Sequence, residues 1–191
     1  MGQWHKSLHA GKITAMEQPN AKQLLRRELI ANRPQSSAGL LEQLKSVVVA
    51  SGAKTIASYQ ALDSEPDTTE FNAWAELGHE VYYPLIKGAD LVFAKSPLVE
   101  GKFGIKEPTG PQQQLSEIDL VFVPALAVDM EGHRLGKGKG FYDRALKDAN
   151  NKNLYAVVFE SEIILEVPSE AHDKKVTGIV TPARVIELSA R

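Results

Sequence analysis

The sequence predicts an α/β protein with three layers, in which a mostly parallel, Rossmann-like sheet lies between helices. Short apolar runs typical of buried strands alternate along the chain with segments of helical periodicity, and this alternation favours a parallel sheet covered on both faces. A glycine-rich segment, residues 136–140, lies between one apolar run and the helical pattern that follows it. That arrangement is typical of a ligand site at the edge of such a sheet.

Length and composition exclude several classes of protein. The chain has 191 residues, 43% of them hydrophobic, which is enough for one sizeable core. A net charge of −2 gives no reason to expect nucleic acid or a membrane surface as a partner. The sequence has no cysteine, so disulfides, thiolate nucleophiles and thiolate metal ligands are excluded. No apolar run reaches the roughly 18 residues that span a bilayer. We expect a cytoplasmic protein, and we expect it to be a monomer.

The N-terminal residues have little apolar periodicity. Residues 1–19 are therefore expected to form a mobile tail, and residues 20–191 a single domain. The tail also lacks the apolar core of a secretory signal. His5 and His9 have the spacing of a helical metal pair, but an unstructured segment is the more economical interpretation.

Three helices and three strands are predicted in the first half of the chain. The first helix covers residues 22–32, and its apolar side is formed by Leu24, Leu25, Leu29 and Ile30. The second covers residues 37–51, with Ser36 as N-cap and Gly52 as its end. A strand at residues 55–59 precedes a third helix, which is capped by Asp67 or Thr68. The inward residues of the third helix are Phe71, Trp74, Ala75 and Leu77. Two further strands are expected at residues 81–83 and 91–94.

The second half of the chain begins with a buried strand at residues 120–123, which Pro124 ends. Asp129 and Gly132 have the spacing of a type I turn. A helix is expected to begin near Gly140, because Tyr142, Ala145 and Leu146 then share one side. Strands are expected at residues 155–159, 176–180 and 185–188.

The segment Gly136-Lys137-Gly138-Lys139-Gly140 predicts an anion site. Free backbone N–H groups at the start of a helix favour a negative ligand, and the two lysines add positive charge. A flexible surface loop with two solvated lysines is the alternative, but the apolar residues Leu126, Val128 and Leu135 argue against disorder. A P-loop is excluded because no Ser or Thr follows the lysine. A dinucleotide fingerprint is disfavoured because Phe141 stands where its third glycine belongs, although Glu160 has the spacing of a ribose-binding acid.

The segment around these glycines resembles the signature of the 5-formyltetrahydrofolate cyclo-ligase family, also called methenyltetrahydrofolate synthetases. The matching residues are Pro124, Asp129, Gly132, Arg134, Leu135, Gly136, Gly138, Gly140, Phe141, Tyr142 and Asp143. The segment 101–108 is also similar to a family motif, and the resemblance extends over roughly residues 20–188. Three positions depart from the family pattern: Pro66, Lys106 and Glu162.

The resemblance implies an ATP- and Mg²⁺-dependent enzyme of folate and one-carbon metabolism. It would convert 5-formyltetrahydrofolate into 5,10-methenyltetrahydrofolate, with ATP phosphorylating the formyl oxygen before N10 closes the ring. The partners implied are a reduced folate and ATP. Two rival interpretations remain at this point: an enzyme of the sugar-phosphate isomerase or coenzyme A transferase-like type, and a non-catalytic sensor of nucleotides or folates.

The same resemblance implies roles for individual residues. ATP would be bound by Lys22, Arg26, Arg134, Gly136, Lys137, Gly138, Lys139, Gly140, Phe141 and Tyr142. Lys139 and Tyr142 would be catalytic, although Tyr142 also fits a packing role. The folate would contact Glu65, Phe103, Ile105 and Glu107. Asp143 and Asp173 would hold Mg²⁺, because a hard cation takes carboxylate and phosphate oxygens.

Five of these residues also have ordinary structural interpretations. Lys22 and Arg26 share one side of a helix, where solvent usually lies. Glu65 can be an ordinary loop carboxylate and Phe103 a core anchor. Asp143 lies in a first helical turn, where a carboxylate contributes about 0.3–1 kcal/mol by pairing with the helix dipole.

Overall fold

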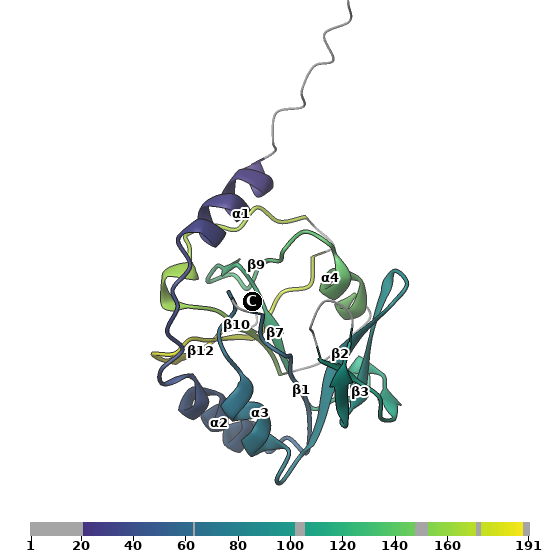
Figure 1. Cartoon of the computed structure of the whole chain (residues 1–191). Helices are drawn as coiled ribbons and strands as arrows, with labels where there is room; N and C mark the ends of the chain where they lie inside the picture. Colours follow the sequence, from purple (N-terminus) through teal and green to yellow (C-terminus); the bar gives the residue numbers. More distant parts are fainter. Residues whose placement is uncertain (1–20, 63, 102–105, 148–152, 171–172, 189–191) are drawn as a thin grey trace, which may run out of the picture.

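The computed structural model describes residues 21–62, 64–101, 106–147, 153–170 and 173–188 (Figure 1). The predicted N-terminal tail and the predicted folate contacts Phe103 and Ile105 lie outside the described residues.

The described strands form one large sheet and two small ones. The eight strands of the large sheet stand in the order β12-β11-β10-β7-β1-β2-β3-β6. Their bounds are Thr55–Ala57 (β1), Glu80–Lys87 (β2), Asp90–Lys95 (β3), Gln112–Gln113 (β6), Leu120–Pro124 (β7), Leu154–Val157 (β10), Gly178–Val180 (β11) and Val185–Glu187 (β12). The small sheets pair β4 (Leu98–Glu100) with β5 (Lys106–Pro108), and β8 (Ala127–Val128) with β9 (Arg134–Leu135).

The pairing confirms the predicted parallel sheet. Strand β1 pairs in parallel with β2 and β7, and β10 pairs in parallel with β7 and β11. Strands β3, β6 and β12 join the two edges antiparallel. The sheet is therefore parallel in its middle, and only its edges are built from hairpins.

The helices lie on both faces of the sheet and beside it. Their bounds are Ala21–Ala31 (α1), Leu40–Ser51 (α2), Thr69–Ala75 (α3) and Phe141–Leu146 (α4), with 3-10 turns at Leu115–Glu117 (η2) and Glu160–Glu162 (η3). Helices α2 and α3 lie side by side, and α4 lies at the opposite side near β3 (Figure 1). The predicted three layers are confirmed, although the layer of α4 is thin.

Alternate residues of the central strand β7 point to the two faces. Leu120 and Phe122 belong to the core beneath α2 and α3, whereas Val121 and Val123 belong to the core that includes Leu146 of α4. A strand that is covered on both faces needs apolar side chains at every position. This requirement explains the unbroken apolar run that the sequence shows there.

Helix α1 packs against a third, smaller cluster. Leu25 and Leu29 contact it, but Leu24 is 53% exposed and Ile30 is 50% exposed, so the predicted apolar side was too wide. The reason is that α1 meets the rest of the protein along one edge only. Leu77 was also predicted to point inward, yet it is 88% exposed because α3 ends at Ala75.

The start of α2 differs from the prediction. Gly39, not Ser36, is the N-cap, with φ of 95°. A Cβ at this position would also lie 2.4 Å from the carbonyl oxygen of Pro182, so only glycine allows this close approach. Ser37 does not enter the helix, and its hydroxyl accepts a hydrogen bond from the N–H of Asp67. No helix of the described residues is long and apolar enough to cross a membrane.

Asp129 fixes the turn between β8 and β9. A turn is present at the predicted residues, with the N–H of Gly132 donating to the carbonyl of Asp129 at 3.0 Å. Its Oδ1 accepts from the N–H groups of Glu131 and His133, and its Oδ2 accepts from the N–H of Val167 at 2.9 Å and faces His133 Nδ1 at 3.1 Å. Burial alone would raise the pKa of Asp129, but the N–H donors of Val167 and His133 lower it below its usual value.

We predict that Asp129→Asn lowers the free energy of unfolding by about 1–3 kcal/mol, because its amide would place a donor against the N–H of Val167. A depressed pKa means that this stabilisation is present above the unfolded value of about 3.9 and is lost as the pH falls below it. Urea unfolding at pH 7 and pH 3 measures both effects, and the gap between variant and wild type should narrow at pH 3. Asp90→Asn, at an exposed position, is the matched control. Equal loss in both variants would contradict a specific role for Asp129.

Candidate active site

The five parallel strands define where a ligand site is expected. Along the chain the order is β1, β2, β7, β10 and β11, whereas in space β1 lies between β2 and β7. The chain therefore proceeds outward from β1 in one direction and from β7 in the other. In open α/β sheets, ligands bind outside the carboxyl ends of the strands at such a switch point. The segments that leave the carboxyl ends of β1 and β7 carry Glu65 and the glycine loop, respectively (Figure 1).

The segment that carries Glu65 is held by a buried hydrogen-bond network. Asn72 of α3 donates to the carbonyl of Tyr59 at 2.9 Å and accepts from the hydroxyl of Ser58 at 2.6 Å. Thr68 donates to the same carbonyl, and the Tyr59 hydroxyl donates to the carbonyl of Pro66 at 3.0 Å. The contact with Pro66, which departs from the family pattern, uses only its backbone carbonyl oxygen. The network ties the end of β1 to the start of α3 and fixes the segment between them.

Glu65 and the glycine loop are in direct contact. Lys137 Nζ lies 2.7 Å from Glu65 Oε1, and the Glu65 side chain is only 6% exposed. The second carboxylate oxygen accepts from the N–H of Leu62 at 3.0 Å. A nearly buried carboxylate needs such partners, because an unpaired buried charge is costly. The structure therefore brings together one residue predicted for the folate and one predicted for ATP.

Helix α1 reaches the same loop through Arg26. Its Nε donates to the carbonyl of Gly136 at 2.9 Å, and its guanidinium lies against Gly138. Gly138 has φ of 94°, and a Cβ there would lie 3.3 Å from the Arg26 guanidinium carbon. Both the backbone conformation and this contact favour glycine. Arg26 consequently holds the loop by its backbone, a role that sequence reasoning did not assign to it.

Lys22, Arg134, Asp143 and Asp173 form a cluster of opposite charges beside the loop. Arg134 donates to Asp143 Oδ1 at 2.5 Å and to the carbonyl of Lys174 at 2.7 Å. Lys22 Nζ lies 3.3 Å from Glu170 Oε1 and 3.8 Å from Asp173 Oδ2. Burial lowers the pKa of Arg134, and the charges of Asp143 and Asp173 oppose this effect, so both predicted metal ligands lie near its guanidinium.

Tyr142 lies at the start of α4 and faces both the core and the site. Its ring meets that of Phe93 with centroids 6.4 Å apart. Burial raises the pKa of Tyr142, and the nearby charge of Glu65 raises it further. The hydroxyl therefore stays protonated at neutral pH and can act as a hydrogen-bond donor, but not as a base.

The remaining predicted residues have simpler surroundings. Gly140 is the N-cap of α4 with φ of 67°, and the Arg144 guanidinium lies 5.2 Å from the centre of the Phe141 ring. Arg144 also donates to the carbonyl of Lys139. Glu107 lies in β5 opposite Val99 of β4, and no hydrogen bond or ion pair joins it to the described part of the glycine loop.

Sequence reasoning missed a buried ion pair at this edge of the sheet. Arg33 donates from Nε to Glu162 Oε1 at 2.6 Å, and from its NH2 group to Glu162 Oε2 and to the carbonyl of Ala125. The Arg33 guanidinium also lies 5.7 Å from the centre of the Phe159 ring. Glu162 had been noticed only as a departure from the family pattern, and the structure shows that its charge is used to neutralise Arg33. No sequence motif contains both residues. Their burial therefore becomes apparent only in the folded structure.

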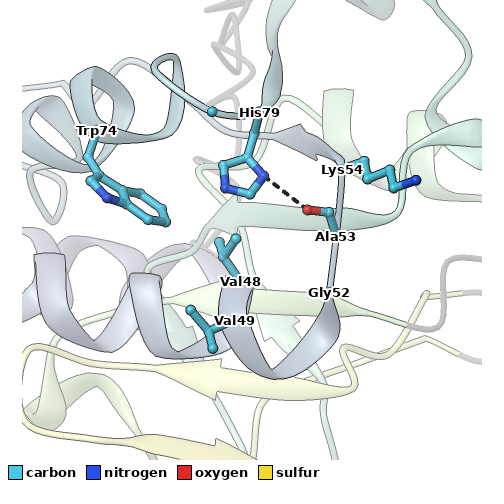
Figure 2. Close-up of a pocket in the computed structure, with 8 residues that line it drawn as sticks. Val48, Val49, Gly52, Ala53, Lys54, Trp74 and His79 are labelled. Carbon is cyan, nitrogen blue, oxygen red and sulfur yellow. Dashed lines mark hydrogen bonds between the residues drawn. The ribbon is translucent and has the colours of Figure 1, made fainter.

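A surface hollow lies away from these residues. It is lined by residues at the end of α2 and around His79, among them Val48, Val49, Trp74 and Lys54 (Figure 2). His79 Nδ1 lies 3.0 Å from the carbonyl of Ala53. These segments precede β1 and β2, so the hollow lies at the amino ends of the strands, opposite the edge at which the predicted site residues gather.

The fold and the contacts define a doubly wound α/β protein with a cationic glycine loop at its switch point. The model of the 5-formyltetrahydrofolate cyclo-ligase family matches residues 18–182, and the chain belongs to that family. The 5-formyltetrahydrofolate cyclo-ligase of Mycolicibacterium smegmatis is 35% identical over 189 residues, which cover 88% of this chain and 97% of that protein. The enzyme of the same name from Haemophilus influenzae is 31% identical and covers 84% of this chain and 85% of its own.

Solved structures agree with this assignment. The Aquifex aeolicus 5,10-methenyltetrahydrofolate synthetase superposes with a TM-score of 0.78 at 30% identity, covering 89% of this chain and 94% of that one. A 5,10-methenyltetrahydrofolate synthetase from Mycoplasma pneumoniae superposes with a TM-score of 0.68 and covers 85% of this chain and 99% of its own. At 18% identity, that second match supports the fold alone.

We predict that the Arg33–Glu162 pair behaves as one unit in stability measurements. Arg33→Met or Glu162→Met alone should each lower the free energy of unfolding by about 3–5 kcal/mol, because each leaves a buried charge without its partner. The double variant should lose much less free energy of unfolding than the sum of the two single-variant losses. Urea unfolding of the four proteins gives the coupling energy, and additive losses would show that the two side chains act independently.

Proposed function

We propose that this protein is an ATP-dependent 5-formyltetrahydrofolate cyclo-ligase, which forms 5,10-methenyltetrahydrofolate with release of ADP and phosphate. The observation that carries the proposal is the contact between Lys137 of the glycine loop and Glu65. In a chain of this family, the contact supports a site in which the loop proposed for phosphate lies against a nearly buried carboxylate proposed for the folate ring. The proposed reaction belongs to cytoplasmic one-carbon metabolism.

The proposed chemistry requires the formyl oxygen to become a leaving group. That oxygen attacks the terminal phosphorus of ATP and displaces ADP. The N10 amine of the folate then attacks the activated carbon, loses its proton, and the ring closes as the C–O bond breaks and phosphate departs. In such a transfer the protein mainly positions the reactants and stabilises phosphoryl charge. Lys137, Lys139 and Arg134 supply positive charge, and the hydroxyl of Tyr142 supplies a donor.

We propose that the Glu65 carboxylate binds the pterin ring by accepting hydrogen bonds from it. A carboxylate only accepts hydrogen bonds, so it matches a pair of ring N–H donors. In the proposed complex, Lys22 and Arg26 lie on the nucleotide side of the site. Arg26 supports this placement through its bond to Gly136.

The donor set near the glycine loop fits Mg²⁺. Asp143 and Asp173 are both near Arg134, and Mg²⁺ usually binds one or two carboxylates together with substrate phosphates. No group of three or more His, Asp or Glu side chains within the described ranges forms a closed metal site. We assign Asp143 and Asp173 as the two protein ligands of Mg²⁺. The ion would neutralise part of the phosphate charge.

The function is tested by following absorbance of methenyltetrahydrofolate after addition of 5-formyltetrahydrofolate. Product should appear with ATP and Mg²⁺, and not without ATP. Equimolar ADP and phosphate should form alongside it. Absence of product with all components present would overturn the proposal.

Asp143→Asn tests the proposed metal role. Turnover per folded molecule should fall by about a hundredfold or more, the scale expected when a group that stabilises transferring charge is removed, and excess Mg²⁺ should recover part of it. Stability should fall by about 1–3 kcal/mol, because Asn keeps an acceptor for Arg134 but loses the charge. Turnover against Mg²⁺ concentration, together with a thermal melt, separates the two effects, and Asp90→Asn is the control. Near-normal turnover with an unshifted Mg²⁺ requirement would remove Asp143 from the metal site.

A further inference from the structure

The Lys137–Glu65 ion pair joins two residues that different ligands require. Lys137 belongs to the phosphate loop, and Glu65 is the acceptor for the folate ring. Lys137 Nζ lies 2.7 Å from Glu65 Oε1, so the ammonium occupies one of the two oxygens that paired ring donors would use. The other oxygen already accepts from Leu62. A folate that approaches this protein without nucleotide must therefore displace or share the Lys137 contact.

Exposure indicates which ligand reaches the pair first. The Lys137 side chain is 37% exposed, whereas that of Glu65 is only 6% exposed. Phosphate groups arriving from solvent can therefore meet the lysine, while the carboxylate lies beneath it. The loop backbone around Lys137 is held by the bond from Arg26 to Gly136. The flexible lysine side chain can consequently change partner without movement of the loop.

We propose that Lys137 is a latch that couples the two ligands. The phosphates of ATP draw its ammonium away from Glu65 and free Oε1 for the pterin, while Oε2 keeps the hydrogen bond from Leu62. This inference rests on the proposed function, and it adds that nucleotide raises the affinity for the folate. Linkage requires the effect to be reciprocal, so the folate raises the affinity for nucleotide by the same factor.

Lys139 provides a matched comparison. It lies in the same loop, two residues away, and no ion pair is found for its side chain among the residues that the structure describes. Removing its charge should weaken nucleotide binding as removing that of Lys137 does. Only Lys137 should also determine how nucleotide changes the folate affinity.

The test measures the Kd of 5-formyltetrahydrofolate by calorimetry, with and without a saturating non-hydrolysable ATP analogue and Mg²⁺. In the wild type the analogue should tighten folate binding by at least about fivefold, the lower end of typical couplings. Lys137→Met should bind the folate more tightly than the wild type without nucleotide, and the analogue should change its Kd by less than about twofold. In Lys139→Met and Lys137→Arg, the analogue should still tighten folate binding as it does in the wild type. Melting curves should show that each variant is folded.

Two results would overturn the latch. One is a wild-type folate affinity that nucleotide does not change, which needs no variant. The other is a Lys137→Met protein that keeps the full dependence. If either result occurs while methenyltetrahydrofolate is still formed with ATP, the latch fails and the proposed function stands. If no protein binds the folate under any condition, both fail.

Discussion

Parallel pairing of β1 with β7 decides where the polar groups of this protein meet. From β1 the chain adds β2 on one side of the sheet, and from β7 it adds β10 and β11 on the other side. The segments that leave the carboxyl ends of β1 and β7 therefore face one another. One segment carries Glu65 and the other carries the glycine loop. A different strand order would leave the same residues on the surface without the contact between Lys137 and Glu65.

The charges at this edge neutralise one another. Lys137 pairs with Glu65, Arg134 with Asp143, and Lys22 lies near Asp173. Each pair combines a residue proposed for phosphate with one proposed for the pterin or the metal. In the proposed complex, each ligand would therefore exchange an internal ion pair for contacts of its own.

The local features of the fold were predictable because they depend on residues close in sequence. Hydrophobic patterns predicted the strand β7 and the start of α4, and the spacing of Asp129 and Gly132 predicted the turn. The motif around Gly138 predicted an anion site, and that site stays a prediction. Its tether, Arg26, lies 110 residues away in sequence, and the contact follows only from how α1 packs.

Long-range contacts were not predictable, since they depend on the assembled topology. Arg33 and Glu162 are separated by 129 positions and form no motif, although together they neutralise a buried charge. The N-cap of α2 was missed for a similar reason, because Gly39 is required by the distant carbonyl of Pro182. Leu77 was misplaced because apolar character alone does not show where a helix ends.

We propose that both ligands bind at the carboxyl ends of β1 and β7. Hydrogen exchange with and without 5-formyltetrahydrofolate and a non-hydrolysable ATP analogue tests it most directly, since bound ligands slow exchange of the amides that they cover or order. Protection is predicted in residues 136–140 and 64–67, with no change around the hollow near Trp74 and His79. Protection confined to that hollow, with unchanged exchange in the glycine loop, would contradict the claim.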